Sequence, residues 1–271
     1  MTDNNEILAQ LNSEIKDADM FLIGMGNELA GAGKKQVESS AFYQTYKDRV
    51  TEDSKSIFEY LSNYQYAANH EKIKQIYQKL IGFLDKKNYF IFSSNTDQLL
   101  QESQLNQIRI VSPCGCVSRL QCECEGEDAF CDATPFYEQM IKALENSSNE
   151  KKINLVEMLP VCKECGQRMF PNVYKEDNYN ENGYLKQWNL YNKWLQRTLN
   201  KKLIILKLGE GFKMPTLMRW PFEKIVFINE KARLYRINKD FYQVPENLHE
   251  KGFAVKSDSK DFLETLLNEN R

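Results

Sequence analysis

Apolar residues along the chain follow two spacings, one typical of helices and one typical of short buried strands. Apolar positions three or four residues apart predict helices at residues 7–15, 54–67, 71–85, 134–144, 188–195 and 261–267. Compact apolar runs predict strands at residues 20–24, 89–92, 108–111, 203–208, 225–228 and 253–255. About six short strands separated by helices are typical of a parallel, doubly wound sheet. We therefore expect an α/β fold with a Rossmann-like sheet.

Two stretches interrupt this alternation and predict a smaller zinc-binding and helical module. One is a pair of helices within residues 38–85, and the other is a cysteine-rich block that begins at residue 114. We expect a Rossmann-like ligand-binding domain at 1–37, 86–113 and 201–271, a helical insertion at 38–85, and a zinc-binding module with a connecting helix at 114–200. The main domain would thus be discontinuous along the chain.

Composition excludes several classes of protein. The chain has 271 residues, 42% of them hydrophobic and 12% aromatic, which excludes a mainly disordered protein. With 36 Lys and Arg against 38 Asp and Glu, it has no bulk attraction for nucleic acid or anionic lipid. The N-terminus lacks a signal-peptide pattern, and the apolar runs fall short of the roughly 20 residues of a membrane span. We expect a soluble, cytoplasmic protein with no nucleic-acid partner and no membrane partner.

All seven cysteines lie between positions 114 and 165. A secreted disulfide scaffold would distribute an even number of cysteines over a short chain, so this clustering favours a metal site. Zinc prefers a tetrahedron of sulfur and nitrogen ligands. The four candidate ligands are Cys122, Cys124, Cys162 and Cys165, with Cys131 as an alternative to Cys124. Four thiolates leave no open position, so we expect a structural zinc; free buried thiols are the other interpretation.

A glycine turn follows the first predicted strand. Gly24, Met25 and Gly26 stand where a backbone can approach a pyrophosphate beside a helix N-terminus. The same glycines also suit a tight turn that needs a positive φ. Because the stretch has no clean G-x-G-x-x-G pattern, it argues against an ordinary dehydrogenase.

Polar residues and glycines also follow later strands. The run Ser-Ser-Asn-Thr-Asp at 93–97, the run Gly-Glu-Gly at 209–211 and Asn229 each come directly after a predicted strand. Since ligands bind beyond the carboxyl ends of strands in open α/β sheets, these residues are candidates to hold a nucleotide. Each one alone is also explained structurally, for example as a helix N-cap.

The order of these motifs resembles the sirtuin family. That family has a glycine turn, a T-Q-N-x-D loop, an H-G dipeptide, two cysteine pairs, a G-T-S turn and an I-N step. The corresponding segments here are Gly24-Met25-Gly26, Ser93-Ser94-Asn95-Thr96-Asp97, Cys114-Gly115, the two cysteine pairs, Gly209-Glu210-Gly211 and Ile228-Asn229. The runs at 85–97 and 206–222 are most similar to class M, the macrodomain-linked sirtuins of microbes.

The resemblance implies a NAD-consuming enzyme, with NAD across the carboxyl ends of the sheet. Asn95 and Asp97 would lie at the nicotinamide and its ribose, where bond cleavage builds a positive charge that polar groups stabilise. The remaining NAD contacts it implies are Gly24, Met25 and Gly26 at the pyrophosphate, Gly209 and Glu210 at the adenosine ribose, and Asn229 at the adenosine end. Class M further implies transfer of ADP-ribose to a protein acceptor, such as a lipoyl-carrier protein.

Cys114 is the main departure from the family, whose ordinary members have a histidine general base at this position. A thiol with an ordinary pKa near 8.5 is mostly protonated at neutral pH and makes a poor base. Two alternatives to ADP-ribosyl transfer therefore stay open. One is NAD-dependent lysine deacylation, which the run Phe-Pro-Asn-Val at 170–173 supports, and the other is a catalytically weak NAD- or ADP-ribose-binding protein. Cys114 itself is either part of the catalytic site or a packing residue or metal ligand beside Cys116.

Overall fold

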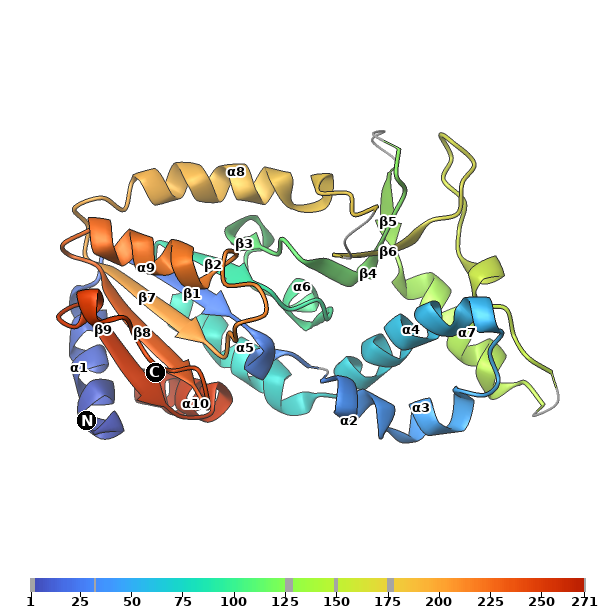
Figure 1. Ribbon diagram of the computed structural model, residues 1–271, viewed down its shortest axis with the longest axis horizontal. Coiled ribbons are helices and arrows are strands. Elements are labelled where there is room, and N and C mark those ends of the chain that lie inside the picture. The colour runs from blue at the N-terminus through green and yellow to red at the C-terminus, as the bar shows by residue number, and fades with distance from the viewer. Residues whose placement is uncertain (1–2, 32, 125–128, 149–150, 175–177, 271) are drawn as a thin grey trace.

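The computed structural model describes residues 3–31, 33–124, 129–148, 151–174 and 178–270 (Figure 1). Its larger sheet has the strands β1 (Met20–Met25), β2 (Tyr89–Ser93), β3 (Ile110–Val111), β7 (Leu203–Leu208), β8 (Arg233–Asn238) and β9 (Gly252–Lys256). The strand order is β3-β2-β1-β7-β8-β9, and every neighbouring pair is parallel. Strands β1 and β7 are buried at every position, which explains their continuous apolar runs. The predicted α/β fold with six parallel strands is confirmed.

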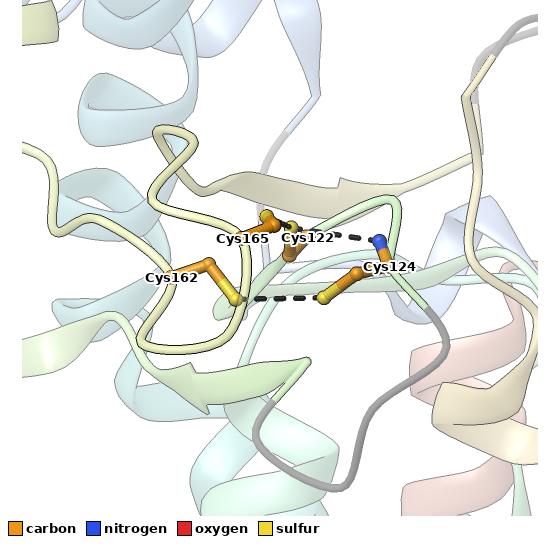
Figure 2. A group of neighbouring side chains, drawn as sticks. All are labelled: Cys122, Cys124, Cys162 and Cys165. Carbon is orange, nitrogen blue, oxygen red and sulfur yellow. Dashed lines mark hydrogen bonds between the residues drawn. The ribbon is translucent and has the colours of Figure 1, made fainter.

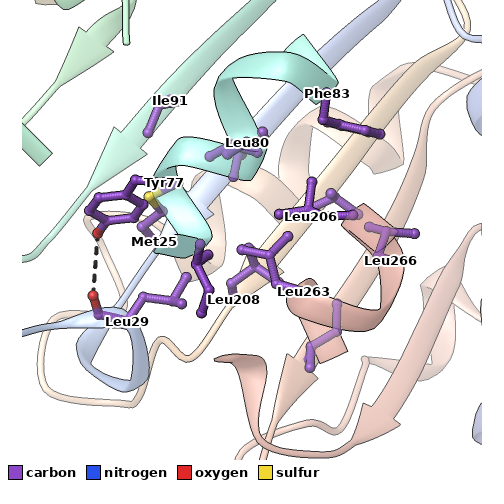
Figure 3. Packing of buried hydrophobic residues seen from close by; sticks show 14 of the residues in the cluster. Met25, Leu29, Tyr77, Leu80, Phe83, Ile91, Leu206, Leu208, Leu263 and Leu266 are labelled. Atoms are coloured by element: carbon purple, nitrogen blue, oxygen red, sulfur yellow. Dashed lines mark hydrogen bonds between the residues drawn. The ribbon is translucent and has the colours of Figure 1, made fainter. Parts of the chain in front are cut away.

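Helices cover both faces of this sheet. One face packs against α1 (Asn4–Asp17), α5 (Glu71–Leu84) and α10 (Ser259–Glu269). Figure 3 shows Leu80 of α5 and Leu263 of α10 close to Leu206 of β7 in this core. The other face packs against α8 (Asn182–Gln196) and α9 (Arg219–Ile228), through Trp194 and Phe222. The sheet is therefore the middle layer of three.

A second module lies beside the sheet, on the right in Figure 1. Its strands β4 (Gly115–Gln121), β5 (Phe130–Asp132) and β6 (Phe170–Val173) form an antiparallel sheet in the order β5-β4-β6. Its helices are α2 (Lys34–Glu38), α3 (Ala41–Tyr46), α4 (Lys55–Ala68) and α7 (Thr134–Glu145). Leu61 of α4 shares one apolar core with Tyr137 of α7 and Leu120 of β4. Helix α4 of the helical insertion thus packs on the cysteine-rich block, although residues 69–113 separate them in the chain.

Short elements complete the described chain. They are α6 (Leu99–Glu102) and the 3₁₀ turns η1 (Asn27–Leu29), η2 (Glu52–Ser54), η3 (Gln107–Arg109), η4 (Val156–Met158) and η5 (Glu246–Leu248). Within the described residues, no helix combines the length and apolar character that a membrane span requires.

The strand predicted at 225–228 is wrong, because these residues form the end of helix α9. Phe222 and Val226 are buried and four residues apart, which is helical spacing. A four-residue apolar run does not by itself distinguish a buried strand from a buried helix. The fifth strand of the sheet is instead β8, eight residues further along the chain.

Candidate functional site

The loops after β1, β2 and β7 meet at the carboxyl edge of the larger sheet, and we call this meeting point the crevice, after the usual ligand site of such sheets. The strand order reverses between β1 and β7, because the chain proceeds outward to β3 on one side and to β9 on the other. Such a switch point at the carboxyl ends of parallel strands is where open α/β sheets bind ligands. The Ser94 amide donates to the Met25 carbonyl at 3.0 Å, and the Gly26 amide donates to the Leu208 carbonyl at 2.8 Å. The three predicted strand-end motifs therefore come together at one edge.

The glycines of the first turn permit close packing. A Cβ at Gly24 would lie 2.5 Å from the Met218 sulfur, so this strand residue lets α9 approach the sheet. A Cβ at Gly26 would lie 2.4 Å from the Glu210 Cα, so the loops after β1 and β7 touch here. Gly209 has a positive φ of 68°, which only glycine adopts readily. The Met25 side chain is buried in the core beneath α5. The pyrophosphate contact of this turn stays a prediction.

Asn95 is the buried polar side chain with the clearest unmet bonding capacity. Neither polar atom of its amide forms a well-aligned hydrogen bond among the described residues, although the Tyr77 hydroxyl lies close enough to interact with it. Its backbone amide donates to Ser93 Oγ at 3.1 Å, which fixes the loop. The nearby Tyr77 hydroxyl donates instead to the Leu29 carbonyl at 3.3 Å (Figure 3). Because an unsatisfied buried amide costs about 1–3 kcal/mol, this position suits a bound polar group that accepts and donates hydrogen bonds.

Asp97 is also buried but has partners on both carboxylate oxygens. Oδ2 accepts from the Gly31 amide at 2.9 Å, and Oδ1 accepts from the Leu99 amide at 3.0 Å. Burial raises the pKa of this carboxyl, while the two amides and nearby His70 favour its charged form. The carboxylate therefore links the loop after β1, at Gly31, to the start of α6, at Leu99.

Cys114 is buried next to Glu210. Burial, together with the neighbouring Glu210 carboxyl, raises the pKa of the Cys114 thiol to about 11. A thiol with this pKa stays protonated at neutral pH and cannot act as a general base. Cys116 does not supply a base either, because burial raises its pKa to about 11 as well.

Glu210 is held in the crevice from both sides. Its Oε2 accepts from Ser94 Oγ at 2.5 Å, and its carbonyl accepts from Lys207 Nζ at 3.1 Å. Burial raises the pKa of the carboxyl, while Ser94 and Lys207 act in the opposite direction. Burial and the neighbouring Arg236 lower the pKa of Lys207 to about 7. The Gly-Glu-Gly turn thus brings a buried carboxyl to the crevice.

The structure does not bring Asn229 to this crevice. Asn229 follows helix α9 and donates to the Thr198 carbonyl at 2.8 Å and the Lys201 carbonyl at 3.2 Å. These partners precede β7, so Asn229 lies at the amino edge of the sheet, opposite the other candidates. Asn229 was expected at the carboxyl end of a strand, but residues 225–228 form the end of helix α9. A residue that follows this helix lies before the next strand, β8, and therefore at the amino edge of the sheet.

Asn238 is the residue that the sequence interpretation missed. It ends β8 in a second Ile-Asn step, Ile237-Asn238, at the carboxyl edge of the sheet. Its Nδ2 donates to the Glu210 carbonyl at 3.2 Å, and its Oδ1 accepts from the Phe241 amide at 2.7 Å. The second Ile-Asn pair is the signal that identifies it, although Arg233 and Arg236 interrupt the apolar pattern of β8.

His70 is a second missed neighbour of the site. It precedes α5 in the helical insertion, and the structure places it close enough to Asp97 for their charges to interact. Burial lowers the pKa of His70, with Lys260 and Lys72 acting in the same direction.

Four cysteines form a compact group in the second module (Figure 2). The sulfur atoms of Cys122, Cys124, Cys162 and Cys165 all lie within 4.8 Å of one another. The Cys122–Cys165 and Cys124–Cys162 sulfur distances are 3.2 and 3.4 Å. A zinc tetrahedron with Zn–S bonds of about 2.3 Å has sulfur atoms about 3.8 Å apart, so the group suits one zinc ion. The Cys131 sulfur instead lies 3.7 Å from the Met169 sulfur, which favours Cys124 as the ligand.

Known proteins with similar sequences are distant. No protein-family model matches the chain. A protein named Protein ADP-ribosyltransferase from Staphylococcus aureus is 21% identical over 276 aligned positions, covering 95% of this chain and 86% of the relative. A protein named Probable bifunctional ADP-ribose hydrolase/ADP-ribosyltransferase from Fusarium oxysporum f. sp. cubense is 27% identical over 168 positions. That match covers 59% of this chain and 28% of the relative.

Solved structures with a similar fold include Sir2 proteins. Sir2Tm bound to a propionylated peptide has a TM-score of 0.53 at 14% identity. A Sir2 variant with a deacetylated peptide and 3′-O-acetyl ADP ribose has a TM-score of 0.51 at 15% identity. Each match covers 97% of this chain and 98% of the other. The chain therefore has the sirtuin fold and is a distant homologue of proteins named as ADP-ribosyltransferases.

Proposed function

We propose that this protein is a NAD-dependent protein ADP-ribosyltransferase of the class M sirtuin type, with NAD bound at the β1–β7 crevice. The observation that carries the proposal is the buried Asn95 amide, whose polar atoms form no well-aligned hydrogen bond among the described residues, at the switch point of a sirtuin fold. Relatives named as ADP-ribosyltransferases support the type of reaction. NAD would supply the bond between nicotinamide and ribose whose cleavage releases ADP-ribose for transfer.

Each crevice residue has a role that follows from its contacts. Asn95 would supply an amide oxygen whose partial negative charge stabilises the positive charge that builds up during bond cleavage, and such preorganised groups lower the barrier without reorganising. Asp97 holds the loop after β1, through Gly31, against the loop after β2 that carries Asn95. Glu210 and Asn238 fix the loop after β7, where the resemblance places the adenosine ribose.

The protonated thiol of Cys114 favours ADP-ribosyl transfer over deacylation. In a deacylase a histidine base removes a proton from a ribose hydroxyl, and base catalysis of this kind contributes about 10²–10⁴-fold. A thiol with a pKa of about 11 does not do this at neutral pH. We therefore place deacylation second and NAD binding without turnover third.

The zinc site has a structural role in this proposal. Its four sulfur ligands come from the second module and leave no coordination position for a substrate. A protein acceptor, with a lipoyl-carrier protein as the first candidate, would receive the ADP-ribose.

The test is NAD binding by calorimetry together with nicotinamide release. We expect Asn95→Ala to reduce nicotinamide release by about 10²–10³-fold, while Asn146→Ala, an exposed asparagine after α7, has no effect. Loss of an acyl group from acyl-lysine at a high rate would favour the deacylase. NAD binding without nicotinamide release would favour the binding protein.

A further inference from the structure

The backbone and the side chain of Glu210 bond to opposite sides of the crevice. The Glu210 carbonyl accepts from Lys207 Nζ and Asn238 Nδ2, on the β7 and β8 side. The side chain instead reaches past the end of β1 to the loop after β2, where Oε2 accepts from Ser94 Oγ at 2.5 Å. A Cβ built at Gly26 would lie 2.5 Å from this same Oε2. The Glu210 carboxyl therefore packs directly on the first glycine turn.

This position conflicts with the negative charge of the ligand proposed for the crevice. The turn at Gly24, Met25 and Gly26 is the expected contact of the pyrophosphate of NAD, and each of its phosphates carries a negative charge. Like charges in a site shielded from water repel strongly, because the low dielectric there screens them poorly. Since Glu210 is only 5% exposed, an ionised carboxyl beside Gly26 would oppose the binding of a pyrophosphate.

The surrounding backbone neither offsets this repulsion nor lets Glu210 move away easily. Several amides of the loop after β1 already have acceptors, since Gly26 donates to the Leu208 carbonyl and Glu28 to the Gly209 carbonyl. The loop that carries Glu210 is fixed by its two hydrogen bonds to the Glu210 carbonyl and by its close contact with Gly26. Neutralising the carboxyl would remove the repulsion without breaking these contacts.

We propose that the pyrophosphate of NAD binds at Gly26 only when the Glu210 carboxyl is neutral, so that NAD binding is coupled to the uptake of a proton by Glu210. A neutral carboxyl has an O–H group that can donate to a phosphate oxygen, whereas a carboxylate can only accept. Burial of Glu210 favours the neutral form by raising its pKa, while Ser94 and Lys207 favour the charged form. The inference rests on the proposed function, because it concerns the same NAD site.

The other ionisable groups around Glu210 differ from it in how they respond to pH. Lys207, with a pKa of about 7, also gains a proton as pH falls, and its charge would attract a phosphate. The Cys114 thiol has a pKa of about 11 and stays neutral at lower pH. Glu28 directs its carboxylate away from the crevice, to backbone amides after β8 and at the start of α10. The titration of Lys207 is therefore the one that an experiment has to separate from that of Glu210.

The test is isothermal titration calorimetry with NAD over a range of pH. Above the pKa of the Glu210 carboxyl, we expect the Kd for NAD to rise about tenfold per pH unit, the slope for one linked proton. Glu210→Gln should make the Kd nearly independent of pH and tighten NAD binding at least about tenfold at about pH 8, because its amide carries no charge. Lys207→Met should keep the slope. The matched control is Glu138→Gln, which removes an exposed carboxylate of α7 and should change neither the Kd nor the slope.

Two further measurements separate the effect of charge from a change in structure. Ser94→Ala removes the donor that favours the carboxylate, so we expect tight NAD binding to persist to higher pH. Adenosine, which has no phosphate, should bind the unmodified protein and Glu210→Gln equally. A pH-independent Kd for NAD in the unmodified protein, an unchanged slope in Glu210→Gln, or an equal gain for adenosine would overturn this inference alone. Absence of NAD binding to both proteins at every pH would overturn the proposed function with it.

Discussion

Two neighbouring buried residues of the crevice, Asn95 and Asp97, differ in how far their side chains are hydrogen-bonded. The Asp97 carboxylate accepts two backbone hydrogen bonds, whereas the Asn95 amide has no well-aligned hydrogen bond among the described residues. Stability and activity should therefore respond differently to their removal. Stabilising residues satisfy their own polar atoms, and ligand-binding residues keep some free for the ligand.

We predict that Asp97→Ala lowers the free energy of unfolding by about 1–3 kcal/mol, because the Gly31 and Leu99 amides lose their acceptors. Asn95→Ala should not destabilise the protein, because the buried amide that it removes has no well-aligned hydrogen bond to lose. Chemical denaturation of both variants measures the difference. An equal loss of stability in the two variants would contradict the assignment of Asn95 to ligand binding.

A pH-dependent prediction concerns Lys207. Its pKa is about 7 in the folded protein and near the ordinary value of 10.5 in the unfolded chain. Between these values the unfolded chain binds more protons, so stability rises as pH increases from 7 toward 10 and is lost as pH falls toward 7. Relative to Lys207→Met, the unmodified protein should gain at most about 1.4 kcal/mol per pH unit. Parallel pH profiles for the two proteins would show that Lys207 keeps an ordinary pKa; the exposed Lys224→Met is the control.

At the scale of elements, the contact between the loops after β1 and β7 is the tightest point of the crevice. Gly26→Ala should destabilise the protein by about 1–3 kcal/mol, because its Cβ would overlap the backbone of Glu210. Gly211→Ala is the matched control, because its Cβ would meet only the Phe241 ring at 3.8 Å. Thermal unfolding compares the two. A stable Gly26→Ala protein would mean that the two loops lie further apart.

The elements show which parts of the fold the sequence predicts. Strands β1, β2 and β7 are continuous apolar runs because both of their faces are covered by helices, so they were predictable. Strand β8 was not, because it contains the fully buried Arg236. The Arg236 guanidinium donates to Glu223 of α9 at 2.5 Å, and no local pattern reveals that a distant carboxylate neutralises it. This hidden ion pair led to the wrong strand at 225–228, and therefore to Asn229 and not Asn238 as the polar residue expected at the carboxyl edge of the sheet.

At the scale of the whole molecule, the second module depends on contacts that are distant in sequence. Cysteine spacing predicted a cysteine metal site, but not the antiparallel sheet that carries it, since strand β6 pairs with β4 across a long separation. The approach of His70 to Asp97 was equally unpredictable, because it arises when the helical insertion packs back on the sheet. Local pattern therefore predicts elements and ligand types, and tertiary packing decides which residues meet.

We predict about one zinc ion per chain, bound by the four-cysteine group. Cys162→Ser should abolish zinc binding and expose β4–β6 to proteolysis, because metal binding and folding of such a site are coupled. Cys131→Ser should keep the zinc, because Cys131 contacts Met169 instead. Elemental analysis with limited proteolysis checks both variants. Zinc-free protein with an intact module, or zinc loss in Cys131→Ser, would contradict the assignment.

The central claim is transfer of ADP-ribose at the crevice around Asn95, and intact mass spectrometry of the acceptor protein after incubation with NAD tests it most directly. We predict a mass gain of one ADP-ribose with the unmodified protein, about 10²–10³-fold slower with Asn95→Ala. With Cys114→Ala it should be little changed, because the thiol stays protonated. An acceptor that loses an acyl group, with that loss abolished in Cys114→Ala, would contradict the account.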